Sequence, residues 1–200
     1  CNTAFGWLGM ELGGDAMREQ ADKFGFGEDL DIPMSVTPST VPAELSPPQE
    51  AQVGIGQYDV RVTPLQVAMV TSAVANDGVV MRPYLVESVQ GDDLSVISET
   101  SPSQLSRAVD PDTASQLTDM MKLVVESGTG RQAAVPGVSV AGKTGTAQHA
   151  DGGGTRVALG QRGEAGALSA GLDDGEHLGC AGQGHRVGHG SILAGDARRA

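Results

Sequence analysis

The feature that most constrains how this chain can fold is a break in its composition at residue 151. Every Phe, Trp, Tyr, Met, Lys and Pro lies within residues 1–150, and the segment 151–200 holds 14 of the 29 Gly. A segment without aromatic residues and rich in Gly and Ala cannot bury enough apolar area to offset its ordering entropy. We therefore expect a folded unit over residues 1–150 and a low-order tail over residues 151–200.

The charge of the folded part narrows the choice of partners. Residues 1–150 carry 19 acidic and 8 basic side chains, and the whole chain has a formal net charge of −12. An acidic body argues against nucleic acid as a partner. The chain has no signal peptide, starting Met or apolar run of membrane-spanning length, so we read it as cut at its front and without an anchor of its own.

The first half of the chain predicts three helices and a long loop. Residues 2–14 and 15–25 each read as a short helix ended by glycine, with Asn2 or Thr3 as the first N-cap. Five prolines between residues 24 and 52 predict a loop. Thr63 then caps a mostly apolar helix, which ends at Asn76-Asp77-Gly78.

The second half predicts alternating strands and helices. Residues 79–90 are rich in β-branched residues and follow a turn signal, which favours a strand pair or an extended segment. Asp110-Pro111 opens a helix with apolar residues at helical spacing, and "ESGTG" ends it. In residues 138–143 the apolar positions then recur every second residue, which is typical of a strand.

That strand contains two competing motifs. Residues 137–144 match the phosphate-loop pattern G-x-x-x-x-G-K-[ST], while Lys143-Thr144-Gly145 matches the K-T-G element of penicillin-recognising enzymes. A phosphate loop needs a buried strand before it and a helix after it. Pro136 interrupts any preceding strand, and "GTAQHADGGG" after Thr144 cannot begin a helix. The residues therefore predict a strand and not a nucleotide site.

Four stretches around this strand occur in the order that a known family uses. They are "CNTAF", "VGIGQYDVRVTPLQVAMVTSAVANDGVVMRPYLV", "VVESGTGRQAAVPGVSVAGKTGTAQ" and the K-T-G-T core within the last. Over residues 1–150 the chain resembles the class B penicillin-binding proteins, particularly the penicillin-binding protein A group. The resemblance implies an α/β fold of α+β type, related to that of the serine β-lactamases, with an antiparallel sheet flanked by helices.

The resemblance also implies roles for individual residues. Residues 143–146 match the K-T-G-T strand motif, and Asn2 matches the third letter of the S-x-N motif, although an N-cap role for Asn2 stays open. The catalytic candidates are Lys143 and Asn2, and the substrate-binding candidates are Thr144, Gly145 and Thr146.

The nucleophile motif S-x-x-K is not found in this sequence. The positions three residues before the three lysines hold Gln20, Asp119 and Val140 instead of Ser. The resemblance implies a peptidoglycan D,D-transpeptidase that cross-links stem peptides through a serine acyl-enzyme and binds penicillin, but we expect this chain alone to be inactive. Two alternatives stay open: a non-catalytic module that binds β-lactam or peptide, and a serine β-lactamase-like enzyme.

The partners implied by the resemblance are D-Ala-D-Ala stem peptides and β-lactams. The parent protein is expected to have a single N-terminal membrane anchor, an extracytoplasmic domain and a cell-wall glycosyltransferase partner. No cofactor is expected. We also expect no metal site, because the potential ligands in the tail fit no compact finger spacing. These ligands are His177, Cys180, His185 and His189.

Two further hypotheses concern the origin of the tail and the ability of the chain to fold. Its Gly, Ala, Arg and His content is what a G/C-rich gene gives when read out of frame, so we place a candidate frameshift near residues 151–155. A chain that lacks the strands on both sides of its best strand could also fail to fold, because its edges would stay open.

Overall fold

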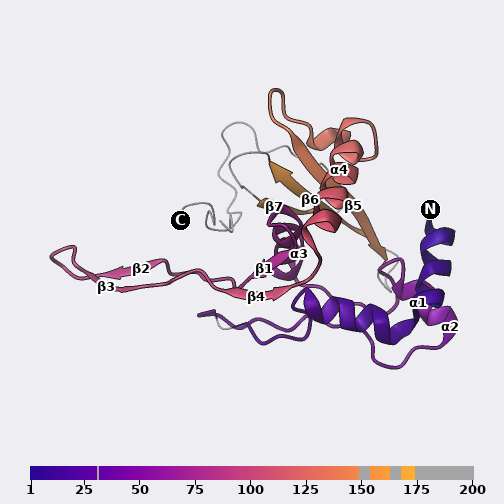
Figure 1. The fold of residues 1–200 in the computed structure, drawn as a ribbon, viewed down its shortest axis with the longest axis horizontal. Coiled ribbons are helices and arrows are strands. Elements are labelled where there is room, and N and C mark those ends of the chain that lie inside the picture. Colours follow the sequence, from indigo (N-terminus) through magenta and orange to yellow (C-terminus); the bar gives the residue numbers. More distant parts are fainter. Residues whose placement is uncertain (31, 149–153, 163–167, 174–200) are drawn as a thin grey trace.

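The molecule has a helical pair at one end of its long axis and a projecting strand pair at the other (Figure 1). The computed structural model describes residues 1–30, 32–148, 154–162 and 168–173. Between the two ends, helices α3 (Pro64–Ala75) and α4 (Pro111–Glu126) contact each other and a three-stranded sheet. The observed elements thus mix helices with antiparallel strands, as the sequence predicts.

Helix α1 (Asn2–Lys23) is interrupted where the sequence predicts a break. Gly13 has φ 76° and ψ 160°, which is outside the helical range, so the helix consists of two segments joined by a kink. The predicted pair of short helices is therefore confirmed. The cap differs from the prediction, because Cys1 holds the N-cap position without a side-chain hydrogen bond, and Asn2 is the first helical residue.

Helix α2 (Pro47–Val53) lies inside the segment that the sequence analysis assigned to a loop. That assignment is wrong for these residues. Proline lacks only an N–H that the first helical turn leaves unpaired anyway, so two prolines can begin a helix. The backbone N–H of Ser46 donates to Gln49 Oε1 at 2.8 Å, which adds the S-x-x-Q capping contact. Helix α2 packs against α1.

The caps of α3 and α4 are the predicted ones. The hydroxyl of Thr63 accepts the N–H of Gln66 at 3.1 Å, and the carboxylate of Asp110 accepts the N–H of Thr113 at 2.8 Å. Each satisfies a backbone donor that has no partner within its helix. These two interactions involve residues three positions apart, so local sequence was sufficient to predict them.

The four short strands form two separate antiparallel pairs. Strand β1 (Val79–Met81) pairs with β4 (Gln104–Arg107), and β2 (Ser88–Gln90) pairs with β3 (Val96–Glu99). The sequence predicts a strand pair or an extended segment over residues 79–90. Both β1 and β2 do lie there, but each pairs with a strand further along the chain.

The hydrophobic core joins α3 to the β1–β4 pair. Its most buried members come from the loop after α1, from α3, from β1 and from the residue that follows β4, and partly buried side chains pack against them. The buried residues are Leu30, Met69, Ala73, Val80 and Ala108, and those packed against them are Phe24, Val36, Leu65 and Leu105. This cluster fixes α3, on which the larger sheet rests.

The larger sheet has the order β5 (Val140–Gln148), β6 (Gly154–Arg162), β7 (Leu168–Asp173), all antiparallel. Residues 154–162 and 168–173 lie in the segment that composition predicts to be a low-order tail, yet they form strands, and β6 pairs with β5 along its whole length. Backbone N–H and C=O groups of a long strand need partners whatever the side chains are, and composition does not reveal that demand. The domain boundary at residue 150 stays a prediction.

Candidate active site

Strand β5 carries the K-T-G residues at one edge of the sheet. In the described part of the chain β5 pairs with β6 only, so its other edge has no strand partner. Val140 and Ala141 are buried, whereas Lys143 and Gly145 are exposed and Thr144 is half-buried. The strand predicted from alternation is confirmed, and its buried start anchors an exposed continuation.

Lys143 differs from the other two lysines in its partners. Lys23 pairs with Glu19 at 3.0 Å and Lys122 with Asp119 at 3.1 Å. The ammonium of Lys143 donates to the carbonyl of Thr144, and the described residues give it no carboxylate partner. Within the described part of the chain, Lys143 therefore presents a positive charge that no acidic side chain neutralises.

Thr144 has a partner that the sequence analysis did not single out. Its hydroxyl lies 2.8 Å from the hydroxyl of Thr129, which belongs to the loop between α4 and the short 3-10 helix η1 (Arg131–Ala133). In the sequence, Thr129 stands in "SGTG", a pattern that predicts only the end of the preceding helix. The pairing of the two threonines could be seen only after α4 and β5 were packed together.

The loop that presents Thr129 is held by short-range hydrogen bonds. Gly130 N–H donates to the carbonyl of Val124 at 2.9 Å, and the guanidinium of Arg131 donates to the carbonyl of Ser127 at 2.9 Å. Both bonds close the C-terminal end of α4, where carbonyls would otherwise lack partners. Thr129 is thus fixed relative to the helix that packs on β5.

The remaining candidate residues are Asn2, which lies in α1, and Thr146, which lies in β5. Asn2 is exposed in the first turn of α1, and no hydrogen bond or ion pair joins it to Lys143 among the described residues. Helix α1 packs against α2, while β5 packs against α4 and β6. The backbone of Thr146 lies opposite Arg156 in the β5–β6 ladder. The structure therefore groups Lys143, Thr144 and Thr129, and it leaves Asn2 on another element.

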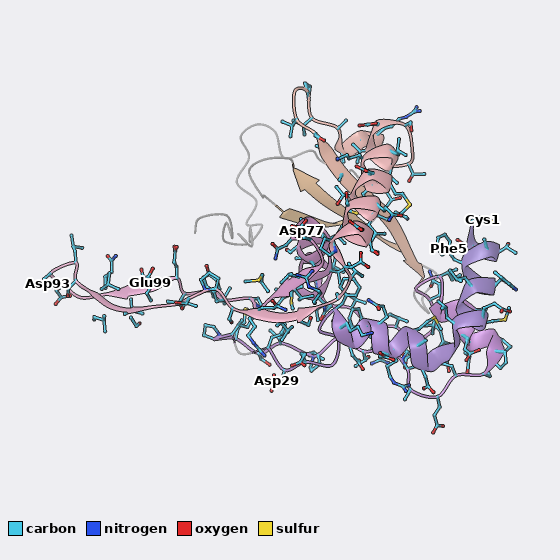
Figure 2. The ribbon with its side chains drawn as sticks, in the orientation of Figure 1. Cys1, Phe5, Asp29, Asp77, Asp93 and Glu99 are labelled. Atoms are coloured by element: carbon cyan, nitrogen blue, oxygen red, sulfur yellow. The ribbon has the colours of Figure 1, made fainter. Side chains whose placement is uncertain are left out.

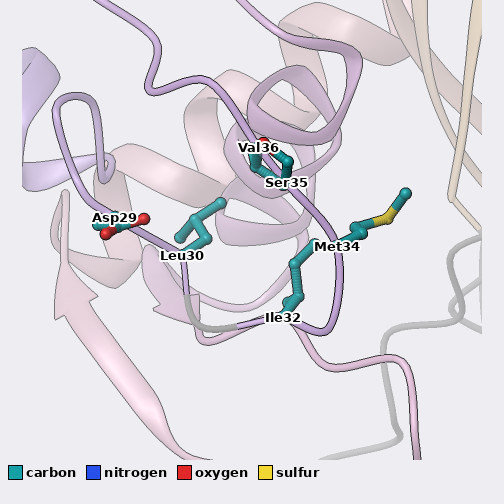
Figure 3. Close-up of a pocket in the computed structure, with 6 residues that line it drawn as sticks. All are labelled: Asp29, Leu30, Ile32, Met34, Ser35 and Val36. Atoms are coloured by element: carbon teal, nitrogen blue, oxygen red, sulfur yellow. The ribbon is translucent and has the colours of Figure 1, made fainter.

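Two cavities lie away from this strand. One, of about 430 Å³, is lined by Asp29, Leu30, Ile32, Met34, Ser35 and Val36 (Figure 3). The other is a groove of about 680 Å³ along α1, whose lining includes Phe5, Leu8 and Leu12. Neither lining contains a residue of β5 or of the Thr129 loop. The candidate site is thus separate from these two cavities, and the edge of β5 that has no strand partner among the described residues suits an extended ligand.

No group of three or more potential metal ligands gathers within the part of the chain that the structure describes. The four tail residues considered as ligands, from His177 to His189, lie outside the described residues.

Comparison with known proteins decides the family. The model of the penicillin binding protein transpeptidase domain matches residues 1–162. The chain belongs to the penicillin-binding protein transpeptidase family. The match runs past residue 150 and includes β6, in agreement with the pairing of that strand with β5.

This member of the transpeptidase family is similar to a peptidoglycan enzyme. It is 46% identical over 150 residues to the peptidoglycan D,D-transpeptidase PbpA of Mycolicibacterium smegmatis. The alignment covers 74% of this chain and 30% of PbpA. The chain thus spans less than a third of that relative. The resemblance stated from the motifs is confirmed.

Solved structures confirm the fold class. The D,D-transpeptidase domain of a peptidoglycan glycosyltransferase from Eggerthella lenta matches with a TM-score of 0.81 and 35% identity, covering 88% of this chain and 46% of that one. Penicillin-binding protein A from M. tuberculosis, solved as an imipenem acyl-enzyme complex, matches with a TM-score of 0.76 and 40% identity, covering 81% and 37%. The α/β transpeptidase fold is therefore shared.

Across the described residues, no helix combines the length and the apolar character that a membrane span requires.

Proposed function

We propose that this chain supplies the K-T-G wall of a peptidoglycan D,D-transpeptidase site, which binds D-Ala-D-Ala stem peptides and β-lactams. The observation that carries the proposal is the open edge of β5 beside Lys143, whose charge has no acidic partner among the described residues. An extended peptide can add to such an edge through backbone hydrogen bonds. The imipenem acyl-enzyme of the M. tuberculosis relative supports β-lactam as a ligand class.

Each candidate residue has a distinct task in this proposal. Lys143 provides positive potential for the substrate and the hydroxyl network, and the exposed Gly145 lets the ligand approach the backbone. Thr144 and Thr146 offer hydroxyls to the terminal carboxylate, and the N–H groups around Thr146 stabilise the developing oxyanion. Asn2 donates to the substrate amide.

The nucleophile of the proposed site lies outside these 200 residues. The sequence contains no S-x-x-K, and the lysines other than Lys143 are engaged in surface ion pairs of α1 and α4. Acyl transfer needs an activated nucleophile, and its loss costs several orders of magnitude in rate. The chain by itself is therefore proposed to be catalytically inactive.

Two wider features follow from the same proposal. The complete protein has a single N-terminal membrane anchor with its transpeptidase domain on the outer side, and it works beside a glycosyltransferase that makes the glycan strands. Both rest on the family membership and are proposals about the whole protein.

A chimera tests the proposed role directly. Residues 1–150 of this chain replace the aligned segment of M. smegmatis PbpA, which supplies the remainder of the enzyme. The chimera should be labelled by fluorescent penicillin, and Lys143→Ala should reduce the labelling rate by orders of magnitude. A folded chimera that stays unlabelled would contradict the proposal.

The 200-residue chain is tested separately by intact-mass spectrometry after incubation with benzylpenicillin. The expected result is no covalent adduct. A mass increase equal to that of benzylpenicillin would overturn the proposed inactivity. Thermal stabilisation by penicillin without an adduct would instead identify the chain as a non-covalent binding module.

A further inference from the structure

Residues 85–100 form an arm that projects from the body of the molecule. Strands β2 and β3 pair with each other and with no other strand in the described part of the chain. Figure 1 shows the arm extending away from the helices, at the opposite end of the long axis from residue 1. Both outer edges of this two-stranded sheet are consequently open.

The arm buries almost none of its side chains. All residues of the arm are exposed except Gly91, which is half-buried. Six large apolar side chains are among them, namely Leu85, Val86, Val89, Leu94, Val96 and Ile97. A two-stranded hairpin is marginally stable alone, and clustered exposed apolar residues usually mark an interaction site. The arm therefore has the composition of a surface that another molecule covers.

The tip of the arm holds a leucine in an unfavourable backbone conformation. Leu94 has φ 63° and is 77% exposed. Its N–H donates to the carbonyl of Gly91 at 2.9 Å, and the Gly91 N–H donates to the carbonyl of Ser95 at 2.9 Å, which closes a three-residue hairpin loop. This left-handed position normally holds Gly. The turn itself therefore does not account for a leucine at this place.

Asp93 fixes the geometry of the tip. Its Oδ1 accepts the Ser95 hydroxyl at 2.6 Å and the Ser95 N–H at 3.1 Å. These hydrogen bonds hold the pKa of the Asp93 carboxyl below its ordinary value, and the bond from the Ser95 hydroxyl has the largest effect. The group therefore stays ionised at neutral pH. Leu94 is thus presented between defined hydrogen bonds and next to the negative charge of Asp93. Figure 2 shows Asp93 at the tip of the arm.

The charge of the arm selects the kind of partner. Residues 83–106 contain the four carboxylates of Glu87, Asp92, Asp93 and Glu99, and they contain no Lys, Arg or His. A second copy of this chain would bring the same carboxylates and a net charge of −12. Nucleic acids and anionic lipid surfaces would be repelled in the same way. A positively charged protein segment is the occupant that the charge favours.

We propose that the β2–β3 arm is a docking site for a protein partner with a basic, extended segment. The segment adds as a third strand along an open edge of the arm, its Lys or Arg side chains face the four carboxylates, and its apolar side chains contact Leu94. This surface is separate from β5, so it can be occupied whether or not the proposed transpeptidase site is.

A binding experiment on the 200-residue chain tests the proposal. The probe is a fluorescein-labelled peptide of alternating Lys and Val, and its affinity is measured by fluorescence anisotropy. Leu94→Gly should weaken binding by about tenfold, as expected for the loss of an apolar anchor. The same variant should leave the urea unfolding midpoint unchanged or higher, because Gly suits the left-handed position. Glu87→Gln combined with Asp92→Asn should weaken binding and flatten its salt dependence.

Two matched variants serve as controls. Met120→Ala removes an exposed apolar side chain from α4, and Glu44→Gln removes an exposed carboxylate outside the arm, so both should bind the probe like the wild type. Equal binding by Leu94→Gly and wild type would overturn the proposal, as would equal affinity for a peptide of alternating Glu and Val. Self-association in sedimentation velocity that Leu94→Gly abolishes would assign the arm to a second copy instead. Binding to phosphatidylglycerol vesicles that depends on Leu94 would assign it to a membrane.

Discussion

The hydroxyls of Thr129 and Thr144 lie 2.8 Å apart and connect the loop after α4 to the strand that carries Lys143. Each hydroxyl donates one hydrogen bond and can accept two. If Thr129 donates to Thr144, the proton of Thr144 stays available for a substrate carboxylate. The contact therefore gives the loop a means of orienting a proposed substrate-binding group.

Replacing Thr129 by Val tests this contact. Thr129→Val keeps the shape of the side chain and removes the hydroxyl. We expect an exposed neutral hydrogen bond of this kind to contribute about 0.5–1 kcal/mol to folding, measured by urea denaturation of the 200-residue chain. In the PbpA chimera, penicillin labelling should slow by about two- to tenfold.

Thr129→Ser is the matched control, because it keeps the hydroxyl and should label at close to the wild-type rate. Equal labelling by the Val and Ser variants would show that the hydroxyl contact does not orient Thr144.

The lysines provide a second test. Lys143→Met removes a charge without an acidic partner among the described residues, whereas Lys122→Met breaks the exposed pair with Asp119. Both changes should alter the stability of the free chain by less than about 1 kcal/mol, as is usual at exposed positions. In the chimera, only Lys143→Met should strongly reduce penicillin labelling. Similar labelling of the two variants would remove Lys143 from the proposed site.

Asp110 should make the stability of the chain depend on pH. Its carboxylate accepts hydrogen bonds from the backbone N–H and from the hydroxyl of Thr113. In the folded state these bonds, that of the backbone N–H having the larger effect, hold the pKa of Asp110 below its ordinary value of 3.8. A depressed folded-state pKa stabilises the protein above the ordinary value, and that contribution is lost as the pH falls through the folded pKa. The stability advantage of wild type over Asp110→Asn should therefore shrink below pH 3.8.

The comparison uses urea midpoints of the two proteins at neutral pH and in acid. Asn keeps the N-cap but does not titrate, so the difference isolates the carboxylate. A difference between the proteins that is constant over this range would contradict the assignment.

Two glycines with positive φ provide a test of local packing. Gly78 has φ 81°, and a Cβ there would overlap the carbonyl of Val109 just before α4 begins. Gly137 has φ 75°, but the space around it is open. Gly78→Ala should destabilise the chain by more than about 2 kcal/mol, because the clash adds to the backbone cost, whereas Gly137→Ala should cost about 1 kcal/mol. Equal urea midpoints for the two variants would show that the backbone moves to relieve the clash.

Local signals account for what the sequence predicted well. The Thr63 and Asp110 caps, the break at Gly13 and the β5 strand all depend on residues a few positions apart. The choice of the K-T-G motif over the phosphate loop also depends on neighbouring residues, since the residues after Thr144 cannot begin a helix. Helix α2 is not predicted, because a cluster of prolines is typical of a loop. Its two prolines are compatible with a helix only because they lie in the first turn.

Most helix boundaries, the strand character of residues 140–143 and the family to which the chain belongs can be read from the sequence alone. Only the tertiary structure decided that β1 pairs with β4, that β6 lies beside β5, and that Thr129 reaches Thr144. Caps and periodicity are properties of neighbouring residues, so they can be read along the chain. Strand pairing and hydroxyl contacts between distant segments depend on how helices α3 and α4 pack against the sheet, and no local pattern encodes that arrangement.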